Sequence, residues 1–182
     1  MLSARLFPVS ALLALLACSP PSFIAEVKGE TTIPASPLGV IAPLDALPAL
    51  SGFSSLDFSQ NQDFQNQGIT KEQVASARLS SVQLKVSAPA DQDFTFLDTV
   101  EFYAKTGDRE VLVASKRDIA SLQLKTPYPV LALELKDVEL QPFITAPSMS
   151  ISVRGNGRMP SHEVRLQADV KLEVKVRGEG AD

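Results

Sequence analysis

The chain has 182 residues, of which 45% are hydrophobic and 21% are charged, and its formal net charge is −4. This apolar content, combined with a small net charge, excludes an intrinsically disordered chain, and the absence of a basic excess argues against a nucleic-acid partner. One cysteine, one histidine and no tryptophan exclude a disulfide scaffold and a zinc site built from cysteine and histidine.

Residues 1–17 have the pattern of a secretory signal peptide. Arg5 precedes an apolar run from Leu6 to Ala17. A helix over this run would be about 18 Å long, which is shorter than the roughly 30 Å hydrocarbon core of a bilayer. We therefore expect the h-region of a cleaved leader and not a membrane span.

The apolar run ends at Leu15-Leu16-Ala17-Cys18, which resembles the lipobox of bacterial lipoproteins. Leu15 and Ala17 fit the residues of that class, whereas Leu16 is larger than usual. The resemblance implies cleavage between Ala17 and Cys18 and acylation of Cys18, with chains such as palmitate. Because one acyl chain binds a membrane only marginally, two or three chains on Cys18 would provide a lasting anchor.

The same resemblance favours the outer membrane of a two-membrane bacterium, because Ser19 and not an aspartate follows the cysteine. Two alternatives remain for Cys18. The leader could be an ordinary signal peptide in which this thiol has no role, or the cysteine could be a small core residue.

Residues 18–22 combine the candidate lipidated cysteine with a tether rich in proline and serine, in which helix and central strand are both disfavoured. Phe23–Ile33 is a candidate first strand, so the domain would cover residues 23–182. Four prolines make residues 34–52 irregular. If residues 23–33 do not pair, the tether extends to about residue 50.

The next segment is polar. Residues 59–68 are rich in amide side chains and predict a loop, and Thr70-Lys71-Glu72-Gln73 matches a capping box that predicts one or two helical turns through Ser76. From there a two-residue period predicts a strand over residues 82–86, with a bulge near Ser80-Ser81 because Leu79 is out of phase.

Further alternation continues toward the C-terminus. Residues 98–116 predict a hairpin that turns at Thr106-Gly107-Asp108. Leu122 and Leu124 predict another strand, Leu131, Leu133 and Leu135 predict the next, and residues 149–153 predict one that leads into a turn at Gly155-Asn156-Gly157.

Residues 164–176 have the clearest pattern, because apolar residues alternate strictly with polar residues over the whole segment. A strand places all the apolar side chains on one face, whereas a helix would scatter them. This strand is unusually long, so we expect it to twist strongly, bend or change sheets midway.

About seven or eight strands with short connections predict an all-β domain. The most favourable arrangement is an antiparallel β-sandwich with Ig-like layer geometry, because each sheet has one apolar face to bury. A small closed barrel is the alternative.

Few residues suggest chemistry. Asp91, Asp93 and Asp98 could bind a metal, but the loop pattern of an EF-hand is absent and aspartates also favour turns. His162 lies at a loop-to-strand junction and lacks a second histidine or a cysteine as partner. The sequence therefore predicts no catalytic residue, no cofactor and no metal site.

Two residue groups have both a functional and a structural interpretation. Acids at Glu134, Asp137 and Glu139 could act in pairs, but only within a cleft that tunes their pKa values. Aromatic residues could line a groove or pack the core, and we favour the core; they are Phe58, Phe94, Phe96, Phe102, Tyr103 and Phe143.

Together these features favour a non-catalytic envelope lipoprotein whose sandwich binds a protein partner or gives structural support. The loops at 59–68 and 88–97, or an exposed sheet edge, are the candidate surfaces. The alternative is a periplasmic protein that binds a lipid or a small hydrophobic molecule in a cavity between the sheets. An enzyme is the least favoured class.

Overall fold

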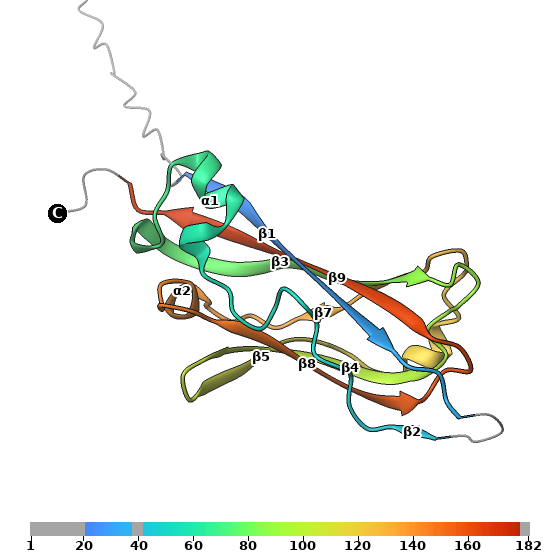
Figure 1. The fold of residues 1–182 in the computed structure, drawn as a ribbon. Coiled ribbons are helices and arrows are strands. Elements are labelled where there is room, and N and C mark those ends of the chain that lie inside the picture. The colour runs from blue at the N-terminus through green and yellow to red at the C-terminus, as the bar shows by residue number, and fades with distance from the viewer. Residues whose placement is uncertain (1–20, 38–41, 179–182) are drawn as a thin grey trace, which may run out of the picture.

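The computed structural model describes residues 21–37 and 42–178. In these residues nine strands form two antiparallel sheets that pack face to face, with short helices at the ends (Figure 1). The expected antiparallel β-sandwich, with its Ig-like pair of layers, is confirmed. Two of the strands are very short: β2 (Pro43–Leu44) and β7 (Glu134–Leu135) have 2 residues each.

The first sheet has four strands in the order β1-β9-β3-β6. Its strands are β1 (Ser22–Ile33), β9 (Val164–Val176), β3 (Val74–Ala88) and β6 (Val130–Ala132). The candidate first strand is thus present, and it pairs with β9 from Ser22 to Ile33. The bulge expected near Ser80-Ser81 is also present, as a shift in the β3–β9 register between Leu79 and Ser81.

Strand β9 confirms the clearest sequence pattern. Its alternate apolar side chains are all buried between the sheets; they are Val164, Leu166, Ala168, Val170, Leu172, Val174 and Val176. The strand does not change sheets, because β1 pairs along one side of it and β3 along the other. Pairing on both sides satisfies the main-chain groups of residues 165–175.

The second sheet has five strands in the order β2-β8-β4-β5-β7. Its longer strands are β8 (Ser150–Arg158), β4 (Leu97–Thr106) and β5 (Arg109–Lys116). The hairpin predicted over residues 98–116 is formed by β4 and β5, and Gly107 lies in its turn with φ of 54°. A positive φ is easily adopted only by glycine, which explains the residue type there.

The turn predicted at Gly155-Asn156-Gly157 is wrong, because these residues continue β8 and pair with β4. Their glycines serve close packing. A Cβ at Gly155 would lie 2.9 Å from Leu47 Cδ1, and a Cβ at Gly157 would overlap the main-chain oxygen of Phe96. The glycines therefore mark a crowded strand and not a reversal of the chain.

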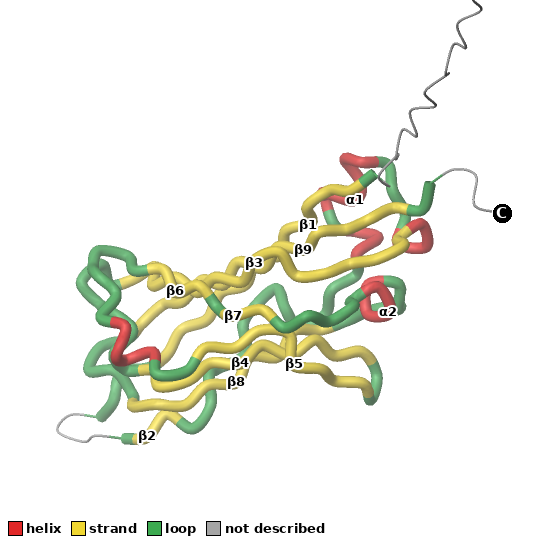
Figure 2. The backbone as a smooth tube through the Cα atoms, turned by 180° about the vertical axis from the view of Figure 1, so that it is seen from behind, coloured by secondary structure: helices red, strands yellow, loops and turns green. Residues whose placement is uncertain are grey.

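Two other strand predictions need correction. Leu122 lies in a 3-10 helix, η3 (Ile119–Leu122), flanked by Asp118 and Gln123 in left-handed conformations that turn the chain sharply. The strand predicted over residues 131–135 is two strands in different sheets, β6 and β7. Figure 2 shows the chain passing between the layers there, and the Leu133 N–H donates to the Val82 carbonyl at the crossing.

The loop predicted over residues 59–68 is mostly helical. It contains the end of η1 (Phe58–Gln60) and α1 (Gln62–Gln67), which is capped by Asn61 and closed by Gly68 in a left-handed conformation. Phe64 explains why this segment is helical, because its buried side chain gives the amide-rich helix one apolar contact with the body. The capping box at Thr70 is confirmed, but its 3-10 helix η2 (Lys71–Gln73) ends before Ser76, where β3 has already begun.

Both open sides of the sandwich are closed by connecting segments. Residues 51–57 bridge β1 and the residue just before β8 through the pairs Glu30–Ser51 and Leu56–Met149. On the opposite side the Leu140 N–H donates to the Ala77 carbonyl of β3, next to the short helix α2 (Gln141–Ile144). The interior between the sheets is consequently a continuous apolar core.

The sandwich has two unlike ends. The near end holds α1, α2, the β4–β5 turn and the start of β1, and the described chain also ends there (Figure 1). The far end holds the loops at 89–96, 117–129 and 159–163. A tether before residue 21 would therefore join the body at the near end.

Candidate functional site

The candidate lipidation and cleavage residues, Ala17 and Cys18, lie outside the described residues. Within residues 21–37 and 42–178, no helix is both long enough and apolar enough to cross a bilayer.

The three aspartates considered as metal ligands do not form a cluster. Asp93 shapes its own turn, since its Oδ1 accepts hydrogen bonds from the Thr95 N–H at 3.0 Å and the Thr95 hydroxyl at 2.5 Å. Asp91 and Asp98 are exposed. In the part of the chain that the structure describes, no group of three or more His, Cys, Asp or Glu residues could hold a metal ion.

His162 is exposed in a far-end loop, where its Nδ1 lies 3.0 Å from the Ser161 hydroxyl. The acids near β7 serve structural roles: Glu134 pairs with Lys116 at 2.8 Å, and Asp137 pairs with Arg78. None of these groups lines the surface pocket described below.

Glu139 completes a sheet edge. Its carboxylate accepts hydrogen bonds from the Ala77 N–H at 2.7 Å, the Ser76 hydroxyl at 2.6 Å and the Gln141 N–H at 2.9 Å. Burial alone would raise the pKa of Glu139, but these donors outweigh burial and the pKa is lowered. Glu139 thus takes the place of a strand neighbour beside β3 at Ser76 and Ala77.

The aromatic residues are divided between the core and the surface. The phenylalanines named from the sequence are buried, and Phe94 stacks on Phe96 with ring centroids 6.3 Å apart. Tyr103 instead lies on the outer face of the five-stranded sheet, where the Arg154 guanidinium covers its ring at 4.1 Å and its hydroxyl donates to Glu101 at 2.8 Å.

The outer edge of β1 is blocked by side chains at Glu26 and by the main chain of Ser51 at Glu30. At Glu26, the main-chain N–H donates to Asp63 Oδ2 at 2.8 Å, and the main-chain carbonyl accepts from Asn61 Nδ2 at 3.2 Å. At Glu30, both main-chain groups pair with Ser51. An incoming strand would have to displace these contacts.

A carboxyl pair lies on the outer face beside this edge. Burial and a hydrogen bond with Glu26 raise the pKa of Asp169, and the same hydrogen bond, assisted by Lys28, lowers the pKa of Glu26. Lys28 and Lys171 lie 3.3 and 3.8 Å from the Glu26 carboxylate. Asp169 therefore keeps its proton more strongly than an ordinary aspartate.

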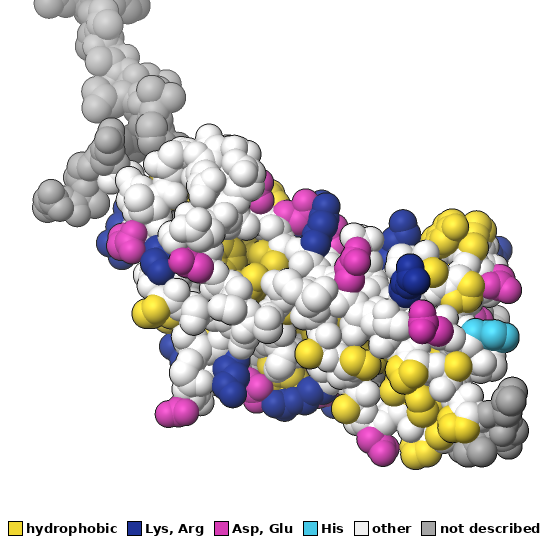
Figure 3. Space-filling view, in the orientation of Figure 1, with side chains coloured by type: hydrophobic (Ala, Val, Ile, Leu, Met, Phe, Trp, Pro, Cys, Tyr) yellow, Lys and Arg dark blue, Asp and Glu magenta, His cyan; other side chains and the backbone are white. Residues whose placement is uncertain are grey.

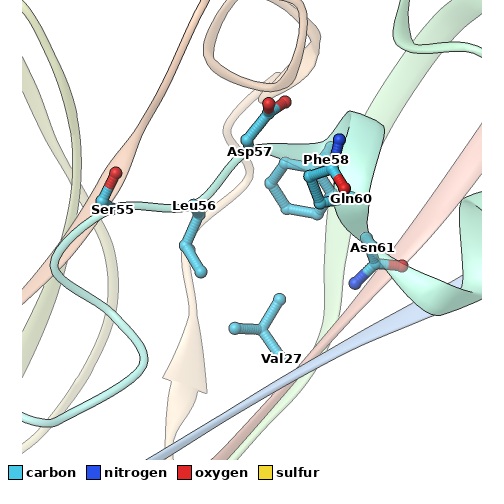
Figure 4. A pocket seen from close by; sticks show the side chains of 7 residues that line it. All are labelled: Val27, Ser55, Leu56, Asp57, Phe58, Gln60 and Asn61. Carbon is cyan, nitrogen blue, oxygen red and sulfur yellow. The ribbon is translucent and has the colours of Figure 1, made fainter.

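A surface pocket of about 330 Å³ lies beneath α1 on the side closed by residues 51–57 (Figure 4). Its floor consists of the apolar side chains of Val27, Leu56 and Phe58, which come from β1, the closing segment and η1. Its polar rim is formed by Ser55, Asp57, Gln60 and Asn61. This volume is at the lower end of the range for small-molecule sites.

The space between the two sheets is much smaller. An apolar void of about 10 Å³ lies in the core, and Phe58 lines both this void and the surface pocket. A void of this size holds at most one water molecule, and its walls offer nothing to bind one. This void therefore has no room for a ligand.

Sequence reasoning missed the surface pocket, because its residues were assigned to irregular segments. The usable signal was the placement of Asp57 and Asn61, each just before a helical turn with one buried phenylalanine. Aspartate and asparagine at such positions are helix N-caps.

Comparison with known proteins identifies no family. No protein-family model matches the chain, and no curated protein matches it. Among solved structures, the chain resembles the BFDV capsid protein in its decameric form, with 6% identity and a TM-score of 0.40, over 87% of this chain and 100% of that chain. It also resembles a chain of turnip yellow mosaic virus, with 10% identity and a TM-score of 0.31, over 99% of this chain and 95% of the other. Likenesses this weak support no conclusion about function.

Proposed function

We propose that this chain is a lipoprotein of the bacterial cell envelope, anchored by acyl chains on Cys18 and carrying a non-catalytic β-sandwich module. The observation that carries the proposal is the apolar run that ends at Leu15-Leu16-Ala17-Cys18. Lipidation explains why an exported chain has a single cysteine at that point.

The geometry of the described body suits such an anchor. Strand β1 begins at Ser22, and the four Cα–Cα steps from Cys18 to Ser22 can span at most about 14 Å. The near end of the sandwich would therefore lie close to the membrane, and the far end would point away from it. In a two-membrane host, Ser19 after the cysteine favours the outer membrane.

We assign partner binding to the far end and not to a sheet edge. The edge of β1 is blocked at Glu26 and Glu30, as described above. Among the far-end residues, Leu122, Tyr128 and Val130 are 40%, 47% and 44% exposed, and Figure 3 shows apolar side chains gathered at this end. An envelope protein is the partner we propose, with residues 88–97 as part of the contact.

The proposal includes no catalysis and no cofactor, because the acids that sequence analysis singled out near β7 are committed to ion pairs and to the β3 edge. Binding of a lipid between the sheets, which is the alternative function, gains no support from a void of about 10 Å³.

The anchor can be tested in cells that express the full chain with and without Cys18→Ser. Cells are grown with an alkyne analogue of palmitate, and the purified protein is examined for the label. We expect label on the natural chain and on a Ser19→Ala control, and none on the Cys18→Ser chain. An unlabelled natural chain, or equal label on the Cys18→Ser chain, would refute the proposal.

A further inference from the structure

The surface pocket beneath α1 combines an apolar floor with an uncharged set of free polar groups. Val27, Leu56 and Phe58 form the floor, and Figure 3 shows an apolar recess on this face among uncharged atoms. Apolar surface that remains in a concave site is a common feature of ligand-binding pockets.

The rim favours a neutral ligand. Asp57 is occupied, since its Oδ1 accepts from the Ser59 N–H at 3.0 Å and lies 3.5 Å from Lys71 Nζ. The Asn61 side chain is also occupied, since its Oδ1 accepts from the Asp63 N–H at the start of α1 and its Nδ2 donates to the Glu26 carbonyl. The Ser55 hydroxyl and the Gln60 amide have no hydrogen-bond partner among the described residues. The groups open to a ligand are therefore neutral, and an anion would lie beside the Asp57 carboxylate.

The surroundings of the pocket disfavour an extended peptide. Peptides that bind beside a strand gain most of their affinity from main-chain pairing. Next to this pocket, the outward main-chain groups of β1 at Glu26 and Glu30 are already bonded to Asn61, Asp63 and Ser51. A ligand that needs no main-chain partner fits better.

We propose that this pocket binds the alkyl chain of a neutral single-chain lipid, with Val27, Leu56 and Phe58 around the chain and Ser55 and Gln60 at its hydroxyl head group. The site differs from the space between the sheets, which Phe58 separates from it. Binding itself does not depend on the anchor. Only the supply of lipid rests on the proposed function, because the anchor would hold the near end beside a membrane.

The natural chain has one cysteine, which permits a clean labelling experiment. In the full chain with Cys18→Ser, a single thiol is introduced by Ser55→Cys at the pocket rim. The matched control is Ser54→Cys, the neighbouring exposed residue, which does not line the pocket. Labelling by a thiol reagent is followed with monodecanoylglycerol added below the concentration at which it aggregates, and decanoate serves as the charged competitor.

At a lipid concentration about ten times its Kd, we expect labelling at residue 55 to slow about tenfold, because the free fraction of the pocket falls by that factor. Labelling at residue 54 should change little, and decanoate should protect much less. Equal protection at both positions, equal protection by decanoate, or no protection by either ligand would overturn the proposal.

A second measurement covers the case in which Ser55→Cys does not fold. The methyl NMR signals of Val27 and Leu56 in the Cys18→Ser chain should shift on titration with monodecanoylglycerol, whereas those of Val164 in the core should not. Unchanged signals, or larger shifts with an apolar peptide than with the lipid, would contradict the proposal. Because Cys18 is absent from these chains, the outcome is independent of whether the natural protein is acylated.

Discussion

The side chain of Asn61 ties the start of α1 to Glu26 at the free edge of β1. Its Oδ1 accepts hydrogen bonds from the N–H groups of Asp63 and Phe64, while its Nδ2 donates to the Glu26 carbonyl at 3.2 Å. The Glu26 N–H donates in turn to Asp63 Oδ2. A short polar helix thereby satisfies an edge strand at the point where another strand could add.

Asn61→Ala should destabilise the protein by about 2 kcal/mol, because both the helix cap and the bond to Glu26 are lost. Asn61→Ser keeps a capping oxygen and loses only the amide donor, so we expect a loss of about 1 kcal/mol. Urea unfolding measures both values. Equal losses for the two variants would mean that the capping oxygen contributes nothing.

Removing both side chains that block the edge should change the association state. In Asn61→Ala with Asp63→Ala, the main-chain groups of Glu26 are left free, and exposed edges pair with other chains. We expect concentration-dependent dimers or larger species in size-exclusion chromatography. The Asn61→Ser single variant is the control and should elute as the natural chain does. A double variant that elutes as the natural chain does would show that the edge is protected in another way.

Asp169→Asn should stabilise the protein at pH 7 by about 1 kcal/mol, because Asp169 Oδ1 is buried without a described partner and its ionised form is disfavoured. Burial and Glu26 raise the folded pKa of Asp169 above the usual 3.8. The folded chain then holds this proton at pH values where the unfolded chain has lost it. The free energy of unfolding therefore falls as pH rises from 3.8 through the folded pKa.

Asparagine has no proton to lose, so this decline in the free energy of unfolding should be absent in Asp169→Asn. Below pH 3.8 the free energies of unfolding of the two chains should converge. The lowered pKa of Glu26 has the opposite effect on stability. Ionised Glu26 stabilises the folded chain, and this stabilisation is lost as pH falls below 4.5. Urea unfolding across this range measures both effects. Asp45→Asn, at an exposed position, is the control, and a natural chain whose stability follows that of Asp169→Asn at every pH would refute this account.

Gly157→Ala should cost at least about 3 kcal/mol, because the new Cβ would overlap the Phe96 carbonyl and β4 would have to move. Gly178→Ala is the matched control, since a Cβ there meets nothing within 4 Å, and its effect should stay within about 0.5 kcal/mol. Thermal unfolding measures both. A mild effect at Gly157 would indicate that β8 and β4 separate easily.

Sequence predicted the strands whose environment is uniform along their length. Strand β9 has neighbours on both sides and one buried face, so its period of two is visible in every residue. The strand predicted at β8 ended too early because Gly155 and Gly157 have the residue type of a turn. Their reason lies in Leu47 and Phe96, which come from distant parts of the chain. Local patterns do not contain such contacts.

The prediction of a loop over residues 59–68 was wrong for a related reason. Its amide side chains favour a loop, whereas the burial of Phe64 against Phe23 and Phe58 stabilises a helix there, together with the Asn61 cap. The pocket beneath α1 depends on that same docking, so it could not be inferred before the helix was placed. In contrast, the lipobox resemblance is read from consecutive residues and needs no fold.

The mass of the first peptide of the mature protein, isolated from cell membranes, tests the central claim most directly. We predict that this peptide begins at Cys18 and carries the added mass of a diacylglyceryl group, with or without a further acyl chain. A first peptide that begins elsewhere, or an unmodified Cys18, would contradict the account.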